Sequence, residues 1–366
     1  MTYKTTIKSS LKSIIFLCGY LITAQSSFEI SSPEMQGVSS EKLELLNDTM
    51  HSFVDNNDIS AIQTAILKNG KLIHFDSYGN SDISEKSTLK SDDIFRIASM
   101  TKPIVSVGLM MLHEEGKFEL DDPVYKYIPE FKNLSVQKRK KIKPAKNPLK
   151  FEPGTTWWYS YATDICGYLI EVLSGQKLDV FLKKRIFDPL EMNDTFFEIP
   201  KDKLDRLTTL YIVDKEKKLI SFDDKSNTPF KDKVVLLNGS GGLLSTTDDY
   251  LKFASMLLNN GIFKNNQLIS KETLDLMKVD HSLGLKYKKL AFGKKKGFGL
   301  GFEIVKEEDT KFGSKGTFGW GGMFGTYFRV DPKENMVIIY MTQSFETYKL
   351  KIADKFRSLI YDSIIQ

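Results

Sequence analysis

The chain has 366 residues, 41% of them hydrophobic, and a formal net charge of +5. This length and composition are typical of a soluble globular protein with one large core. Three lysines in an acid-free N-terminal stretch supply part of the charge, so the remainder carries only about +2, which gives no general affinity for nucleic acid. A basic cluster at residues 138–143 contains no aromatic residue and is interpreted as a solvated loop.

The N-terminus has the pattern of an export signal. Its lysines precede an apolar stretch at residues 14–24 that is too short to span a bilayer comfortably. We therefore expect a signal peptide at residues 1–24, cleaved after Ala24, and a periplasmic or secreted protein without a stable membrane span. Lipidation of Cys18 is the alternative, but Leu17 occupies a position where a small residue is wanted.

Residues 25–366 are expected to form one domain with Cys166 as its sole cysteine, so no intramolecular disulfide can form. Asn69-Gly70 predicts a hairpin between two strands, and strands return near the C-terminus before a final amphipathic helix. The expected strands are 62–67, 72–78, 299–305, 325–330 and 336–342, and the expected middle helices are 164–173, 178–186 and 247–258. This order predicts an α+β fold, with an antiparallel sheet built from both ends of the chain and a helical lobe at roughly 115–240.

A serine stands at the head of an apolar helix. Ser99-Met100-Thr101-Lys102 is followed by Pro103 and an almost continuous apolar run. Proline lacks an N–H group, so a helix through it begins no more than a turn earlier, which places Ser99 at its start. Five other serines have a lysine three residues later, but none heads such a helix: Ser9, Ser39, Ser87, Ser135 and Ser174.

This spacing places Lys102 within reach of the Ser99 hydroxyl, because residues i and i+3 share a helix face. A serine hydroxyl is a poor nucleophile until a neighbour accepts its proton. A neutral lysine can do so, or a charged lysine can assist another base such as a tyrosine phenol. Histidine is then unnecessary, which suits a chain with four histidines and no Gly-x-Ser-x-Gly motif.

Other segments extend the pattern in a fixed order. They are Phe95-Arg96-Ile97-Ala98-Ser99-Met100-Thr101-Lys102-Pro103, Leu120-Asp121-Asp122-Pro123-Val124, residues 153–164, Gly241-Gly242-Leu243-Leu244-Ser245-Thr246 and residues 316–328. With these segments, the chain from about Ser32 onward resembles the serine β-lactamase and penicillin-binding superfamily. Within it, the chain looks most like the β-lactamase-like carboxylesterases, which implies a β-lactamase/transpeptidase-like fold.

The resemblance implies a role for each matching residue. Ser99 would be the acylated nucleophile, Lys102 its activating partner and Tyr159 the phenolic general base. The backbone N–H groups of Ser99 and Met323 would form the oxyanion hole. Substrate would lie against Trp320 and against Tyr161, Gly321 and Gly322.

Three departures from the superfamily pattern bear on the substrate. Tyr161 stands where β-lactamases usually have asparagine, and Trp320 stands where a lysine or histidine usually begins the third motif. Residues 147–151 join directly to the Pro153 segment, where relatives carry a longer stretch. We expect this short join to leave the cleft more open, or to be covered by a partner subunit; the oligomeric state is not predicted.

We therefore expect an exported serine hydrolase that acts through an acyl-enzyme on small carboxylic esters. The alternatives are a β-lactamase or D-alanyl-D-alanine carboxypeptidase, and a catalytically weak protein that binds wall peptides. No cofactor or metal is expected, because the sequence has no Cys/His cluster, and His113-Glu114-Glu115 lacks the second histidine of a zinc helix.

Overall fold

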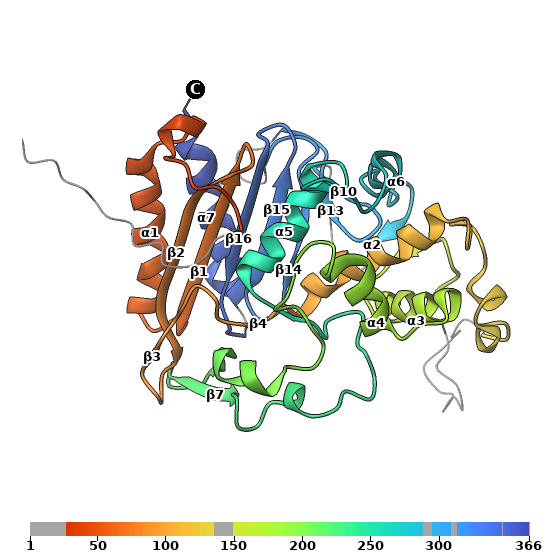
Figure 1. The fold of residues 1–366 in the computed structure, drawn as a ribbon, viewed down its shortest axis with the longest axis horizontal. Coiled ribbons are helices and arrows are strands. Elements are labelled where there is room, and N and C mark those ends of the chain that lie inside the picture. Colours follow the sequence, from red (N-terminus) through yellow and green to blue (C-terminus); the bar gives the residue numbers. More distant parts are fainter. Residues whose placement is uncertain (1–26, 135–148, 288–294, 309–312, 346, 366) are drawn as a thin grey trace, which may run out of the picture.

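An eight-stranded antiparallel sheet lies at the centre of the computed structural model, which describes residues 27–134, 149–287, 295–308, 313–345 and 347–365 (Figure 1). The strand order is β12-β13-β14-β15-β16-β1-β2-β3. The pairing of β1 with β16, with Gln63 opposite Met341, joins the two ends of the chain and confirms the predicted architecture. The bounds are β1 (Ala61–Lys68), β2 (Lys71–Asp82), β3 (Ser87–Thr88), β12 (Lys296–Phe298), β13 (Glu303–Val305), β14 (Phe318–Gly322), β15 (Thr326–Asp331) and β16 (Met336–Met341).

The predicted signal peptide, the basic cluster at 138–143 and residues 147–148 of the short join lie outside the described residues. Each of these therefore stays a prediction.

Helices cover both faces of the sheet. The helices α1 (Ser40–Asp55) and α7 (Ile352–Ser363) pack on one face, where they share a hydrophobic cluster with β1 and β16 (Figure 1). The sequence analysis did not predict α1, although the Ser39 side chain caps it by accepting a hydrogen bond from the Lys42 N–H. On the other face, α5 (Thr247–Leu258) lies against β15 and β16.

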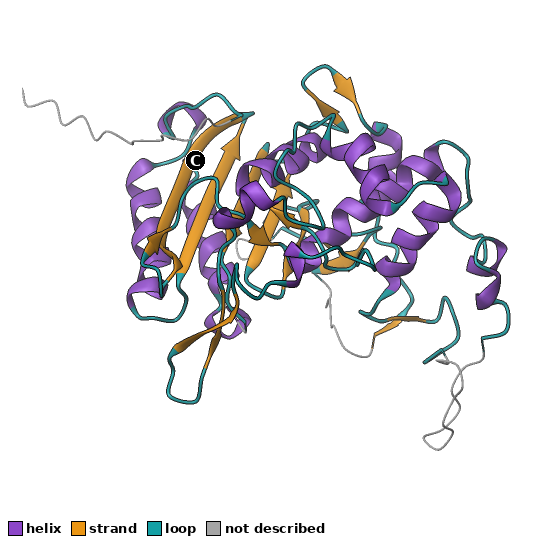
Figure 2. Ribbon diagram, turned by 60° about the horizontal axis from the view of Figure 1, so that its bottom comes forward, coloured by secondary structure: helices purple, strands orange, loops and turns teal. Residues whose placement is uncertain are grey.

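The helical lobe lies beside the sheet (Figure 2). It contains α2 (Thr101–Glu114), α3 (Ala162–Ser174) and α4 (Leu178–Leu182), and α6 (Lys271–Met277) follows later in the chain. The helix expected at 178–186 is α-helical only to Leu182 and continues as a π-helical turn over Lys183–Phe187. No helix within the described ranges is long and apolar enough to cross a membrane.

The strand expected at 299–305 is shorter than predicted. A turn at its beginning separates β12 from β13: the Gly299 N–H donates to the Phe302 carbonyl oxygen at 2.9 Å, and Gly301 has a φ of +102°. Glycine adopts this positive φ without steric cost. The segment is therefore a hairpin, and only Glu303–Val305 forms the strand.

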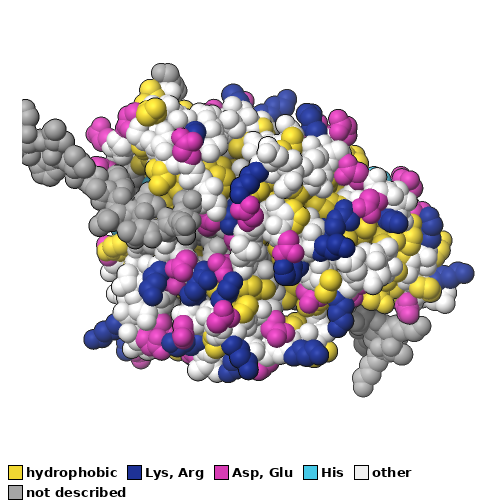
Figure 3. Space-filling view, in the orientation of Figure 1, with side chains coloured by type: hydrophobic (Ala, Val, Ile, Leu, Met, Phe, Trp, Pro, Cys, Tyr) yellow, Lys and Arg dark blue, Asp and Glu magenta, His cyan; other side chains and the backbone are white. Residues whose placement is uncertain are grey.

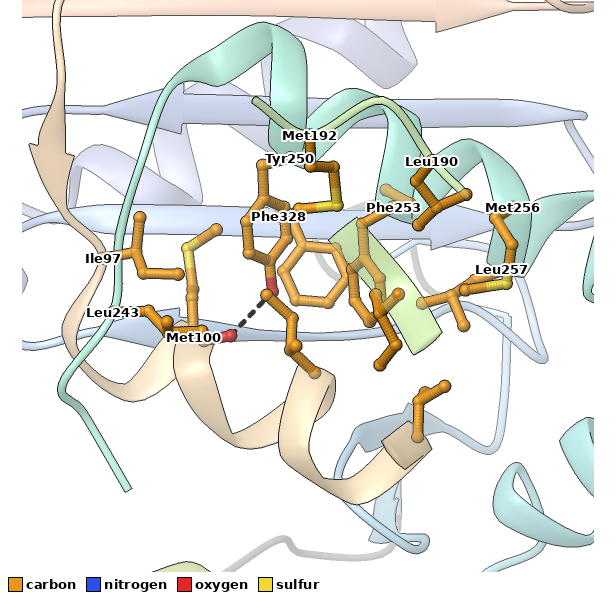
Figure 4. Close-up of a cluster of buried hydrophobic side chains, with 14 of the residues drawn as sticks. Ile97, Met100, Leu190, Met192, Leu243, Tyr250, Phe253, Met256, Leu257 and Phe328 are labelled. Atoms are coloured by element: carbon orange, nitrogen blue, oxygen red, sulfur yellow. Dashed lines mark hydrogen bonds between the residues drawn. The ribbon is translucent and has the colours of Figure 1, made fainter. Parts of the chain in front are cut away.

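The helix that follows Ser99 is held by a buried cluster between the sheet and the lobe (Figure 4). The Tyr250 hydroxyl of α5 donates a hydrogen bond of 2.9 Å to the Met100 carbonyl oxygen. The Tyr250 ring packs edge-on against Phe328 of β15, with centroids 4.9 Å apart. Most of α2 is buried, as its apolar sequence predicts. Both the sheet and α5 therefore fix the position of this helix.

Candidate active site

Ser99 lies in the turn that leads from the sheet side into the helical lobe. The short strand β4 (Phe95–Arg96) precedes it, a 3₁₀ turn spans Ala98–Met100, and α2 begins at Thr101. The prediction that Ser99 begins the α-helix was thus off by one tight turn. Ala98 has a φ of +45°, which a non-glycine residue rarely adopts and which reverses the chain direction just before Ser99.

The side chains of Lys102 and Tyr159 meet at the Ser99 hydroxyl. The Tyr159 hydroxyl donates a hydrogen bond of 2.6 Å to Ser99 Oγ. Lys102 Nζ donates to the same oxygen at 3.3 Å and lies 4.7 Å from the centre of the Tyr159 ring. A nucleophile, a base within hydrogen-bond reach and a cation beside both are the elements that acyl transfer requires.

Lys102 is held by backbone from the opposite side of the site. It is only 7% exposed, and its Nζ donates to the Ser240 carbonyl oxygen at 2.5 Å. The Ser240 N–H in turn donates to Asp164 Oδ1 in the first turn of α3 at 2.9 Å. Sequence reasoning did not single out Ser240 or Asp164 as site residues, because their contribution depends on contacts between segments far apart in the chain.

The strand β14 approaches Ser99 closely, and glycine makes this possible. A Cβ atom on Gly322 would lie 2.5 Å from the Ile97 carbonyl oxygen and 3.3 Å from the Ala98 Cβ. The Thr326 hydroxyl donates to the same Ile97 oxygen at 3.0 Å and ties β15 to this turn. The Met323 backbone follows directly after β14, so the predicted oxyanion residues lie on segments that contact each other.

Three aromatic rings surround the predicted base. Tyr159 lies 5.7 Å from Trp320 and 6.2 Å from Trp157, measured between ring centroids. Phe298 closes the cluster at 5.2 Å from Trp320 and 5.0 Å from Trp157. Within the described residues, the buried Trp320 Nε1 has no hydrogen-bond partner. The wall of the site beside Ser99 is therefore largely apolar.

The strand before the nucleophile is fixed by a buried arginine. Arg96 Nε and Nη2 donate to the two Asp223 carboxylate oxygens at 2.9 and 2.5 Å, and Nη1 donates to the Thr208 carbonyl oxygen at 2.6 Å. Burial lowers the pKa of Arg96, and the ion pair with Asp223 opposes this shift. Asp223 ends β7 (Leu219–Asp223), which pairs with β6 (Leu210–Val213), so Arg96 anchors this hairpin to the segment that leads into Ser99.

Two predicted substrate-binding residues differ in their surroundings. Trp320 faces Tyr159, as described above. Tyr161 is 76% exposed at the N-terminus of α3. Tyr161 was assigned to substrate binding by resemblance, and this role stays a prediction.

The chain is similar to proteins of a known family. The Beta-lactamase family model matches residues 46–142 and 142–361, in two pieces that meet near the short join. Esterase EstB of Burkholderia gladioli is 22% identical over 76% of this chain and 84% of its own length. The D-alanyl-D-alanine-carboxypeptidase/endopeptidase AmpH of Escherichia coli K12 is 24% identical over 78% of this chain and 80% of its own length.

Solved structures share the fold. EstCE1, a hydrolase with promiscuous acyltransferase activity, superposes with a TM-score of 0.76 at 19% identity, covering 87% of this chain and 98% of its own. Simvastatin synthase LovD of Aspergillus terreus gives 0.76 at 18% identity, covering 90% of this chain and all of its own. Since the family model spans most of the sequence and the fold agrees, the chain belongs to the beta-lactamase family, whose members are serine hydrolases.

Proposed function

We propose that this protein is an exported serine hydrolase that cleaves small carboxylic esters through an acyl-enzyme on Ser99. One observation carries the proposal: the Ser99 hydroxyl lies 2.6 Å from the Tyr159 hydroxyl and 3.3 Å from Lys102 Nζ. The esterase named among the relatives supports the choice of substrate class.

The first half-reaction forms the acyl-enzyme. Tyr159, as a phenolate stabilised by the Lys102 ammonium, takes the Ser99 proton while Ser99 Oγ forms a bond to the ester carbonyl carbon. The N–H groups of Ser99 and Met323 donate to the oxyanion of the tetrahedral intermediate. The bond to the alkoxy oxygen then breaks, and Tyr159 returns its proton to the leaving alcohol.

The second half-reaction releases the acid. Tyr159 takes a proton from water, whose oxygen bonds to the acyl carbon. The Ser99 ester bond then breaks, and Ser99 regains a proton from Tyr159. The Ser240 carbonyl holds Lys102 in place through both steps, so the cation stays beside the phenolic oxygen.

Trp320 favours uncharged esters over acidic lactams. A lysine or histidine in this position would pair with a substrate carboxylate, whereas the indole offers one neutral donor and an apolar face. The surrounding rings of Trp157, Tyr159 and Phe298 add apolar surface. An ester without a charge can use this wall without leaving a carboxylate unpaired.

Labelling with a fluorophosphonate tests the nucleophile. We expect one adduct per chain by intact mass, mapped to Ser99, and none in Ser99→Ala. Ser240→Ala is the matched control, because Ser240 lies beside Lys102 and should still allow labelling of Ser99. An adduct on Ser240, or none on folded wild-type protein, contradicts the proposal and favours a catalytically weak binding protein.

A substrate panel tests the reaction class. We expect a higher kcat/KM for p-nitrophenyl butyrate than for a chromogenic cephalosporin or a D-alanyl-D-alanine peptide. The carboxypeptidase relative makes the peptide a necessary comparison. Preference for the lactam or the peptide would replace esterase activity with that alternative.

The proposed export has its own test. Expression of the full chain in a bacterium, followed by fractionation and N-terminal sequencing, should yield a periplasmic or secreted protein that begins at Gln25. A cytoplasmic protein that retains residues 1–24 would contradict this part of the proposal.

A further inference from the structure

A cavity of about 640 Å³ is lined on one side by α3, and Ser99, Lys102 and Tyr159 are not among its lining residues. Its walls are α3, α4 with the π-helical turn after it, residues 192–200 and the segment 233–237. This volume is within the range of small-molecule sites. The catalytic steps described above do not use it.

Exposed apolar side chains surround the mouth of this cavity. Val235 is 98% exposed and Leu236 82% exposed, while Tyr168 of α3 and Val180 of α4 are about half exposed. Soluble proteins seldom leave such side chains grouped without a ligand or partner. Figure 3 shows hydrophobic side chains gathered among charged ones over the helical lobe.

Charged groups in the cavity wall are largely engaged by the protein itself. Glu171 Oε1 accepts a hydrogen bond from the Leu178 N–H at 2.9 Å, and Glu198 Oε2 accepts one from the Val234 N–H at 3.4 Å. Lys183 pairs with Asp188. Lys177, Asp179 and Lys233 also line the cavity, so its wall combines charged groups with the apolar surface that an acyl chain would contact.

The cavity walls continue directly into the catalytic site. Asp164 of α3 lines the cavity and accepts the Ser240 N–H, while the Ser240 carbonyl holds Lys102. The segment 233–237 leads to Ser240 within three residues, and α3 begins just after Tyr159. Tyr159, the predicted base, and Ser240, whose carbonyl holds Lys102, are therefore close in sequence to the two segments that form cavity walls.

One face of α3 runs between the Ser99 site and the cavity. Tyr161, Asp164, Tyr168 and Val172 follow the spacing of a single helix face. The aromatic and aliphatic members of this face are exposed. At 1.5 Å per residue, the step from Tyr161 to Tyr168 is about 10 Å, which only a long chain covers.

We infer that the cavity and this face of α3 bind the acyl chain of the substrate, so that the enzyme prefers esters of longer, unbranched fatty acids over esters of very short ones. This inference rests on the proposed function, because it takes Ser99 as the site of acylation. The carbonyl group would lie at Ser99, and the chain would run along Tyr161 and Tyr168 toward Leu236.

Chain-length dependence tests the inference. In the wild type, kcat/KM should be at least about tenfold higher for p-nitrophenyl laurate than for p-nitrophenyl butyrate, which is the effect of burying only two of the eight additional methylene groups. Tyr168→Asp and Leu236→Asp should bring this ratio close to one and leave the rate with butyrate unchanged. Ile262→Asp, an exposed apolar position outside the cavity, is the matched control and should keep the wild-type ratio.

Binding of a product-like acid tests the site without catalysis. Dansylaminoundecanoic acid should bind Ser99→Ala with enhanced fluorescence, and dansylglycine, which lacks the chain, should not. Tyr168→Asp in the same background should weaken binding at least about tenfold. If no ester is cleaved but the dansyl acid binds in this way, the proposed function is wrong, and the cavity is still a binding site for an acyl chain.

Three results would overturn the inference. The first is a laurate-to-butyrate ratio near one in the wild type, together with no binding of the dansyl acid. The second is a ratio or binding that Tyr168→Asp and Leu236→Asp leave unchanged, since the chain would then bind elsewhere. The third is a dimer in analytical ultracentrifugation that Leu236→Asp dissociates, since the apolar rim would then be an interface between copies.

Discussion

Replacing Tyr159 by phenylalanine removes one oxygen atom from the candidate site and leaves the ring in its aromatic surroundings. The lost hydroxyl contacts Ser99 Oγ at 2.6 Å, while the packing against Trp320 and Trp157 is retained. If the hydroxyl only oriented Ser99, its loss would cost about 1 kcal/mol, or a fivefold lower rate. If it is the general base, kcat with p-nitrophenyl butyrate should fall by about 10² to 10⁴, or about 3 to 5 kcal/mol.

A Lys102 variant, alone and combined with Tyr159→Phe, tests whether Lys102 and Tyr159 act together in one catalytic step or contribute independently. Lys102→Ala should also reduce kcat by about 10² or more, because the cation that stabilises the phenolate is lost. The double variant should be little slower than either single variant, since the two side chains act as one unit. Lys102→Ala also leaves the buried Ser240 carbonyl without its 2.5 Å partner, so its folding must be checked by thermal melting.

The assay is steady-state hydrolysis of p-nitrophenyl butyrate, with Tyr348→Phe as a matched control at an exposed tyrosine. The control should retain wild-type kcat. A Tyr159→Phe variant within about fivefold of wild type, with normal melting, would refute the phenolic base and leave Lys102 as the proton acceptor.

Other changes have outcomes that follow from single contacts. Burial lowers the pKa of His74 to about 4. As pH falls from about 6.5 to about 4, the unfolded chain therefore binds a proton that the folded chain does not, and the free energy of unfolding decreases. In urea titrations, His74→Gln should reduce this decrease by about 2 to 3 kcal/mol. The comparison with wild type is needed because burial raises the pKa of Asp93 to about 6, which gives the opposite slope. Trp320→Lys should raise kcat/KM for an acidic cephalosporin relative to p-nitrophenyl butyrate by about one to two decades; an unchanged ratio would show that the indole does not set this preference. Gly322→Ala should lower kcat at least about tenfold. The added Cβ atom would lie 2.5 Å from the Ile97 carbonyl oxygen and force β14 away from Ser99. Full activity in a purified, folded variant would contradict this close approach.

The sequence alone identified the helix that holds the candidate nucleophile and most of the sheet. The apolar run after Pro103 could only be a buried helix, and Asn69-Gly70 specified the hairpin of β1 and β2. The spacing of Ser99 and Lys102 is local, so their proximity follows from helix geometry. The role of Tyr159 came from resemblance, because nothing local connects residues 99 and 159.

The helix α1 was missed although the sequence signals it: Ser39 is an N-cap residue, and the buried residues Leu43, Leu46, Met50 and Phe53 follow helical spacing. The turn at Gly299–Phe302 was also not predicted. An apolar stretch with two glycines has the pattern of a strand, and only the hydrogen bond from the Gly299 N–H to the Phe302 carbonyl oxygen shows that it is a turn.

The tertiary structure decided what surrounds the reacting atoms. It placed the Ser240 carbonyl on Lys102, and it assembled the aromatic wall from residues as far apart as Trp157 and Trp320. It also opened a cavity between α3 and the segment 233–237. Local spacing fixes helix faces and hairpin registers because neighbouring residues share one backbone, whereas contacts between distant segments depend on how whole layers pack.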